Sequence, residues 1–197
     1  MASKPIPSPE VLRQLLRYEP ETGKLFWEPR GPEWFAHLDR PEVESRIWIG
    51  RNAGREAFTA SDGKGYLQGQ VLKYHTMAHR VIWAMHAGEW AGLIDHINGN
   101  GCDNRIANLR AVSSKENGRN AATPVTNSSG IMGVRFYKGG WEACIFVDGR
   151  QRHLGRYRTK ADAAAARKAA EAAHGYHPNH GRPASVFRRL RRGASMG

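Results

Sequence analysis

The chain is poor in cysteine and has no long hydrophobic run. Cys102 and Cys144 are its only cysteines, and neither lies in a Cys-x-x-Cys pair. We therefore expect two free thiols and neither a disulfide framework nor a cysteine-rich zinc site. No apolar run approaches the roughly 20 residues that a membrane span requires. The first residues lead into a charged, proline-containing stretch rather than an apolar secretory core, so we expect a soluble, cytoplasmic protein.

Acidic residues are scarce after residue 120. Residues 121–197 hold 14 Lys and Arg against 4 Asp and Glu, which accounts for +10 of the formal net charge of +12. Such a region favours an anionic partner. Nucleic acid fits better than a membrane, because the basic residues are interleaved with strands and turns and do not lie opposite a bulky apolar face. The alternative is a basic surface that only confers solubility.

Local patterns predict a mixture of short helices and strands in the first 120 residues. Ser8-Pro9 indicates the start of a helix over residues 8–18, and residues 24–27 are typical of a strand. Residues 28–65 show no clear pattern. Residues 66–74 indicate a hairpin, and residues 77–86 a helix ended by Gly88. Two short strands, at residues 93–94 and 108–112, then flank a turn, and a capping box begins a helix near Ser114.

The last part of the chain has a different pattern. Residues 121–130 lack periodicity and are the best candidate for a linker. Three strands are expected between residues 133 and 157, with Asp148-Gly149 as a hairpin turn. Thr159 can cap the alanine-rich helix that follows. The tail from Gly175 is basic, and we expect it to be a disordered arm that binds phosphate.

These patterns predict an α+β protein made of small modules. The expected divisions are an N-terminal helix-strand region at 1–64, a central module at 65–120, the linker at 121–130, a sheet-plus-helix module at 131–176 and a basic tail at 177–197.

The segment after residue 93 has the residue types that phosphodiester hydrolysis needs. Asp95 offers a carboxylate oxygen, His96 an imidazole that titrates near neutrality, and Asn117 an amide oxygen. One base and one divalent ion can activate a water, stabilise the phosphate charge and neutralise the leaving group. Because neighbouring strand residues point to opposite faces, Asp95 and His96 should act from different directions, with the imidazole facing solvent where a scissile bond can lie. The alternative for the short stretch alone is a hairpin turn whose asparagines satisfy backbone groups.

Four blocks in this region resemble the HNH nucleases of phages and mobile introns. They are Ala78-His79-Arg80, Asp95-His96-Ile97-Asn98-Gly99, the run from Asn104 to Arg110, and Ser114-Lys115-Glu116-Asn117. The resemblance covers about residues 65–120 and implies a ββα-metal fold. It also implies a phage or mobile-element protein acting in the cytoplasm of a bacterial host, with double-stranded DNA as partner.

The same resemblance assigns roles residue by residue. It implies that His96 is the general base, that Asp95 and Asn117 hold the metal, and that Asn108 supports the loop and the base. Asn117 stands where many relatives have histidine, which favours Mg²⁺ or Mn²⁺ over zinc. No small-molecule cofactor is expected. His79 is either a residue that contacts phosphate or assists the site, or a histidine packed beneath the motif, and we keep it outside the catalytic set.

Residues 127–176 resemble the sheet-plus-helix DNA-binding domain of plant ethylene-response factors, of the APETALA type. The matching positions include Gly133-Val134-Arg135, Trp141-Glu142-Ala143 and His153-Leu154-Gly155. The resemblance implies a sheet that enters the major groove. Cys144, Phe146 and His153 depart from the plant pattern, so the fold carries over better than the base readout. Across the chain, the expected DNA contacts are Arg80, Arg105, Arg135, Arg150, Arg152, Arg188 and Arg189.

The sequence leads to the hypothesis of a metal-dependent DNA endonuclease that nicks or cuts both strands. One alternative is a non-catalytic DNA-binding regulator with a decayed nuclease module, and another is a nuclease that acts on RNA. His174, His177 and His180 resemble a metal cluster, but they lack acidic or cysteine partners, so we expect them in a solvated tail. The target sequence, the oligomeric state and the biological role are left open.

Overall fold

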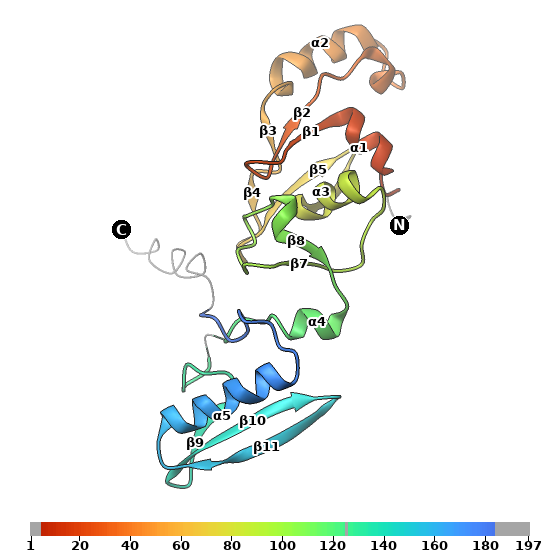
Figure 1. The fold of residues 1–197 in the computed structure, drawn as a ribbon. Coiled ribbons are helices and arrows are strands. Elements are labelled where there is room, and N and C mark those ends of the chain that lie inside the picture. The colour runs from red at the N-terminus through yellow and green to blue at the C-terminus, as the bar shows by residue number, and fades with distance from the viewer. Residues whose placement is uncertain (1–4, 125, 184–197) are drawn as a thin grey trace, which may run out of the picture. The chain divides into compact units, whose positions relative to one another are not determined.

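The computed structural model describes residues 5–124 and 126–183 (Figure 1). The chain forms two compact units, Met1–Ala111 and Val112–Gly197, which are described separately below. No helix in the described residues is both long and apolar enough to cross a membrane. The mixture of short helices and small antiparallel sheets confirms the expected α+β class.

The first unit contains three small sheets and three α-helices. Its helices are α1 (Pro9–Leu15), α2 (Pro41–Asn52) and α3 (Ala78–Ala87), with 3-10 turns η1 (Pro32–Phe35) and η2 (Ile106–Asn108). Its strands are β1 (Leu16–Glu19), β2 (Lys24–Trp27), β3 (Glu56–Ala57), β4 (Ala60–Ser61), β5 (Leu67–Val71), β6 (Tyr74–Met77), β7 (Ile94–His96) and β8 (Leu109–Ala111). The sheets have the orders β1-β2-β3, β4-β5-β6 and β7-β8, and all pairings are antiparallel.

The predicted start of α1 and the predicted end of α3 are confirmed. The Ser8 side chain accepts a hydrogen bond from the Val11 amide, and proline occupies the first turn of α1. Gly88 ends α3 with a φ of 78°, a left-handed conformation that glycine adopts readily. Helix α1 ends earlier than expected, because the chain enters strand β1 at Leu16.

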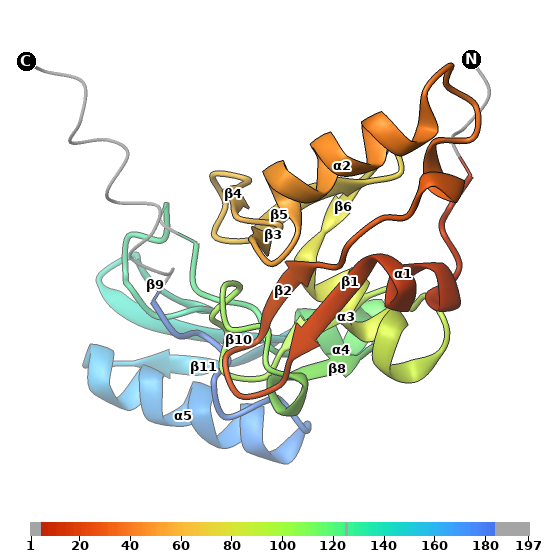
Figure 2. The same cartoon turned by 90° about the horizontal axis from the view of Figure 1, so that it is seen from above.

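One hydrophobic core joins the N-terminal region to the central motif. It combines residues of α1, α3 and β8, among them Leu12, Leu15, Val81, Ile82 and Leu109, all of them buried. The expected boundary between residues 64 and 65 is therefore not a boundary between compact units. Figure 2 shows α1 and α3 close together, in agreement with their packing.

Residues 28–65 gave no clear pattern and contain four elements that the sequence did not predict: α2, η1, β3 and β4. Helix α2 packs against η1, and strands β3 and β4 extend two of the sheets. Helix α2 has almost no amphipathic character and buries only Ser45. Because α2 has no apolar stripe, the sequence of this stretch shows no helical periodicity, and the helix could not be predicted.

The second unit contains a three-stranded sheet covered by one helix, as expected (Figure 1). Its elements are α4 (Ser114–Gly118), β9 (Val134–Tyr137), β10 (Gly140–Val147), β11 (Arg150–Tyr157) and α5 (Lys160–Ala173). The small core consists of Val134, Ala143 and Ala163, with Trp141 and Tyr157 packed against it. Thr159 caps α5 by accepting a hydrogen bond from the Asp162 amide.

Two expectations for the second unit were wrong. Residues 121–130 are not a free linker, because Thr123 is buried and its amide donates to the Arg182 carbonyl at 2.8 Å. His180 does not lie in a solvated tail: it is 3% exposed and contacts Arg167 and Glu171 of α5. Arg188 and Arg189, two of the expected DNA contacts, lie outside the described residues.

Candidate active site at the β7–β8 hairpin

Strand β7, paired with β8, carries both the predicted base and a predicted metal ligand, on opposite faces. Asp95 lies opposite Arg110 in the hairpin register, and His96 lies opposite Leu109. Successive residues of a strand point to opposite sides, so the carboxylate and the imidazole leave the hairpin in different directions, as expected. Both side chains are buried, with relative exposures of 7% and 4%.

His96 belongs to a cluster of three rings, formed with Tyr66 and His79. The His79 and His96 centroids are 5.0 Å apart in an edge arrangement, and Tyr66 lies 5.7 Å from His96 and 5.5 Å from His79. We expected the His96 ring to face solvent, and that expectation was wrong. Long-range packing of α3 and the segment before β5 around the hairpin buries the ring.

Burial keeps both imidazoles neutral. It lowers the pKa of His96 below its ordinary value of 6.5. It lowers the pKa of His79 to about 3, with His96 and Arg80 acting in the same direction. At neutral pH, His96 is therefore in the form that accepts a proton.

Asn104 fixes the orientation of the His96 ring, a role that sequence reasoning missed. Its Oδ1 lies 3.0 Å from His96 Nε2. An amide oxygen accepts, so Nε2 carries the proton in this arrangement and Nδ1 holds the lone pair. Asn104 is itself 1% exposed. The Tyr18 hydroxyl donates to the Asn104 carbonyl at 3.2 Å and accepts from the Ile106 amide at 2.8 Å, which ties this loop to β1.

Asn108 holds the loop that connects the two strands. Its Oδ1 accepts from the Asn98 amide at 2.9 Å, and its Nδ2 donates to the Asp103 carbonyl at 2.8 Å. These bonds close the turn after His96. We expected Asn108 to support this loop, and its contacts are suited to that role.

The Asp95 carboxylate already has a cationic neighbour. Arg110 donates to its Oδ2 from Nη2 at 2.7 Å and from Nε at 3.1 Å. No group of three or more His, Cys, Asp or Glu side chains able to hold a metal is present in residues 5–124 and 126–183. A site built on one carboxylate and amide oxygens still fits a hard cation such as Mg²⁺, which retains several waters.

Asn117, the other predicted ligand, lies on the exposed surface of α4 in the second unit. The helix begins as the capping box predicts: the Ser113 hydroxyl accepts from the Glu116 amide, and the Glu116 carboxylate accepts from the Ser113 amide at 2.8 Å. Whether Asn117 shares an ion with Asp95 remains a prediction.

Comparison with known proteins identifies the segment that contains this site. Residues 76–119 match the family model described as HNH endonuclease. The matched segment, called the HNH segment below, includes Asp95, His96, Asn108 and Asn117. The chain is also similar to Protein 3.8 of Escherichia phage T7, with 37% identity over 63 residues, or 31% of this chain. The alignment covers 52% of that relative, about half its length. No solved structure matches the chain.

Two arginines expected to bind DNA from the first unit have partners within it. Arg80 donates to the carbonyls of Ala91 and Gly92 at 3.1 and 3.0 Å. Arg105 pairs with Asp103 at 2.6 Å, and this contact lowers the pKa of Asp103 to about 2. Arg80 therefore holds the segment before β7 in place through hydrogen bonds. Arg105 is exposed on the surface.

The three arginines expected on the sheet of the second unit do not share one face. Arg135 lies opposite Glu142 of β10, whereas Arg152 lies opposite Ile145 and Arg150 opposite Val147. Positions 142 and 145 have opposite parity on β10, so Arg135 is on the other side of the sheet from Arg150 and Arg152. Ile145 and Val147 share the side of Ala143, which packs against α5.

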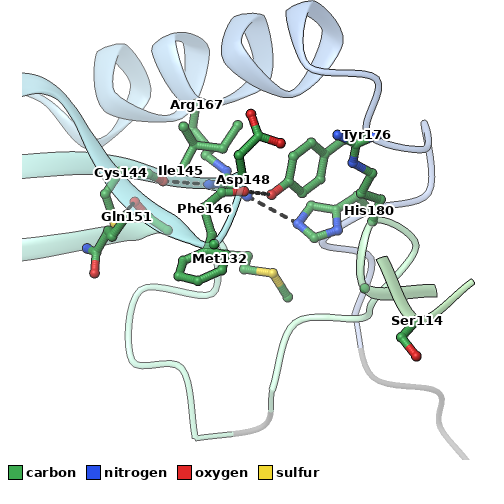
Figure 3. A pocket seen from close by; sticks show the side chains of 14 residues that line it. Ser114, Met132, Cys144, Ile145, Phe146, Asp148, Gln151, Arg167, Tyr176 and His180 are labelled. Carbon is green, nitrogen blue, oxygen red and sulfur yellow. Dashed lines mark hydrogen bonds between the residues drawn. The ribbon is translucent and has the colours of Figure 1, made fainter. Parts of the chain in front are cut away.

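A cavity of about 920 Å³ lies at the end of this sheet (Figure 3). Strand β9 pairs only with residues 140–143 of β10, so later carbonyls of β10 need other donors. Arg167 donates to the Cys144 carbonyl and Tyr176 to the Phe146 carbonyl, both at 2.5 Å. These bonds, drawn in Figure 3, hold α5 and the residues after it to the sheet edge. Both cysteines are free thiols, as expected.

Proposed function

We propose that the chain is a divalent-metal-dependent DNA endonuclease, with His96 as general base and with Asp95 and Asn117 as ligands of Mg²⁺ or Mn²⁺. The observation that supports this most is the fixed, neutral His96 beside Asp95 within the HNH segment. When bound, the cation would stabilise the charge that builds up on the phosphate and on the leaving oxygen.

In this proposal the proton of the attacking water is accepted by a residue of the hairpin. His96 Nδ1 accepts a proton from a water as the water oxygen bonds to phosphorus and one ester P–O bond breaks. The leaving oxygen takes a proton from solvent. Asn104 keeps the ring in this tautomer, and Asn108 holds the loop that positions it. We place the approach of the phosphodiester on the Tyr66 side of the ring, because Tyr66 is the exposed member of the cluster.

The second unit would supply DNA affinity. It contains a three-stranded antiparallel sheet and one helix in a basic part of the chain, and its resemblance to the ethylene-response-factor domain stays a prediction. We propose that Arg135 faces the groove, while Arg150 and Arg152, on the edge strand β11, reach flanking phosphates. The salt dependence of binding would measure the number of phosphate contacts.

Specific observations favour the second candidate, a non-catalytic DNA-binding regulator. Asp95 is occupied by Arg110, and His96 is buried. Incubating the protein with a supercoiled plasmid in Mg²⁺ and in EDTA separates the two functions. The endonuclease yields nicked or linear product only with Mg²⁺. Binding without scission would favour the regulator, and preference for a folded RNA in the same format would favour an RNA nuclease.

A further inference from the structure

The first unit contains an aromatic groove that lies N-terminal to the HNH segment in sequence. The groove has a volume of about 440 Å³, within the range of small-ligand pockets. Its lining residues include Trp27, Arg30, Trp34, Phe35, Trp48 and Lys73. They come from the end of β2, from the loop between β2 and η1, from η1, from α2 and from the turn between β5 and β6.

Arg30 lies over two indole rings that are nearly perpendicular to each other, and among the described residues it has no anionic partner. Its guanidinium carbon lies 4.2 Å from the Trp48 ring centroid and 5.1 Å from that of Trp27. Its backbone is fixed, since the buried Ser45 hydroxyl donates to the Arg30 carbonyl at 2.7 Å. In the part of the chain that the structure describes, Nε has no hydrogen-bond acceptor and no carboxylate forms an ion pair with Arg30. Contacts with ring faces use none of the guanidinium N–H donors; Nε is buried, and the terminal N–H groups of Arg30 are suited to an oxyanion.

The other lining residues extend this chemistry. The described residues that line the groove include no Asp or Glu, and Lys73 adds a second positive charge. Trp34 and Phe35 are only partly buried and present further π surface. Burial lowers the pKa of Arg30 to about 10, so it remains cationic at neutral pH.

The turn that carries Lys73 is unusual. Leu72 and Lys73 both have positive φ values, 47° and 63°. A two-residue hairpin turn of this kind normally uses Asn and Gly. A bulky leucine in the left-handed region is disfavoured, and such conformations cluster at binding sites. Leu72 is 41% exposed and lies at the groove.

We propose that the aromatic groove binds one unpaired nucleotide of a DNA strand, with the base stacked on the aromatic side chains and a phosphate paired with Arg30 and Lys73. The combination of planar rings with unpaired positive charge matches a nucleotide, because every base offers a π face beside a phosphate. An acidic peptide would use the charge but not the stacking surface. The choice of DNA rests on the proposed function.

Fluorescence anisotropy with the full chain tests this site. The probes are a twelve-residue oligothymidylate and a fully paired duplex, both in EDTA so that no cleavage occurs. Arg30→Gln and Trp34→Ala should weaken oligothymidylate binding by about 5- to 100-fold and change duplex binding less than twofold. Arg55→Gln, which removes an exposed charge outside the groove, is the matched control. Equal losses for both probes, or none, would overturn the proposal.

Cross-linking locates the contact even if a groove variant fails to fold. An oligothymidylate carrying 5-iododeoxyuridine should cross-link wild-type protein within the tryptic peptides 25–30, 31–46 and 47–51, which contain the groove aromatics Trp27, Trp34, Phe35 and Trp48. Cross-links confined to other peptides would refute the site, and stronger binding of oligouridylate would reassign it to RNA. Both measurements are independent of cleavage. If the protein cuts plasmid but fails these tests, only the nucleotide site is refuted. If it passes them but does not cut plasmid, only the nuclease function is refuted.

Discussion

Asp95 and Arg110 lie directly opposite each other across the β7–β8 hairpin, and the guanidinium contacts the carboxylate oxygen Oδ2 at 2.7 Å. The pair neutralises a carboxylate that is 7% exposed. If Asp95 is a metal ligand, a cation and Arg110 compete for its charge. The hairpin register therefore controls how available the carboxylate is.

Replacing Arg110 by glutamine should tighten Mn²⁺ binding while lowering stability. Loss of the competing charge should lower the dissociation constant about tenfold, equivalent to ~1.4 kcal/mol. The buried carboxylate left behind should reduce the free energy of unfolding by about 1–3 kcal/mol. Titration calorimetry and urea denaturation measure the two effects. Arg105→Gln is the control, and weaker Mn²⁺ binding by folded Arg110→Gln protein would show that the guanidinium orients the ligand instead.

His79 should make the protein lose stability in acid. Its pKa is about 3 in the folded chain and has an ordinary value of 6.5. Between these values the unfolded chain binds the proton more strongly, so the free energy of unfolding falls as the pH falls from 6.5 toward 3, by up to ~1.4 kcal/mol per pH unit. The stabilising effect of the neutral ring is complete above pH 6.5.

Denaturation curves at pH 7 and pH 4.5 test this dependence. His79→Gln should show a smaller difference between the two pH values than wild type. His86→Gln, an exposed substitution on the same helix, should behave as wild type. An unchanged pH dependence in folded His79→Gln protein would remove His79 as its source.

The two faces of the second sheet should contribute unequally to DNA binding. Arg135→Ala should weaken duplex binding more than Arg152→Ala, whereas Arg152→Ala, which removes a proposed phosphate contact, should reduce the slope of log affinity against log salt by about 1. Glu142 pairs with Arg135 at 2.9 Å, so Glu142→Gln should strengthen binding. Anisotropy titrations at several salt concentrations measure these effects. A larger loss for Arg152→Ala would mean that the opposite face meets DNA.

The two units should unfold as separate transitions, because each has its own core. Ile82→Ala should destabilise the first unit by about 2–5 kcal/mol, and Ile145→Ala should act on the second. Scanning calorimetry should show each substitution lowering one transition only. A shift of both transitions by either substitution would contradict independent cores.

The sequence predicted those features that depend on neighbouring residues. The Ser8 and Thr159 caps, the Gly88 terminus and the Asp148-Gly149 turn are local signals, and the structure has each of them. The α+β class followed from such signals.

The features that the sequence did not predict depend on residues far apart in the chain. The burial of His96 arises from Tyr66 and His79, and its orientation from Asn104. The separation of Arg135 from Arg152 depends on the register of β10 and on the irregularity next to Ala143. The periodicity of a short stretch of sequence cannot predict contacts between residues so far apart in the chain.

The rate of plasmid cleavage by His96→Ala tests the central claim most directly. Under single-turnover conditions in Mg²⁺, the variant should cleave supercoiled plasmid ~10²–10⁴ times more slowly than wild type, the range expected for loss of a general base. Its DNA affinity should stay within twofold, and the exposed His75→Ala control should cleave at the wild-type rate. Wild-type cleavage by folded His96→Ala protein would contradict the account.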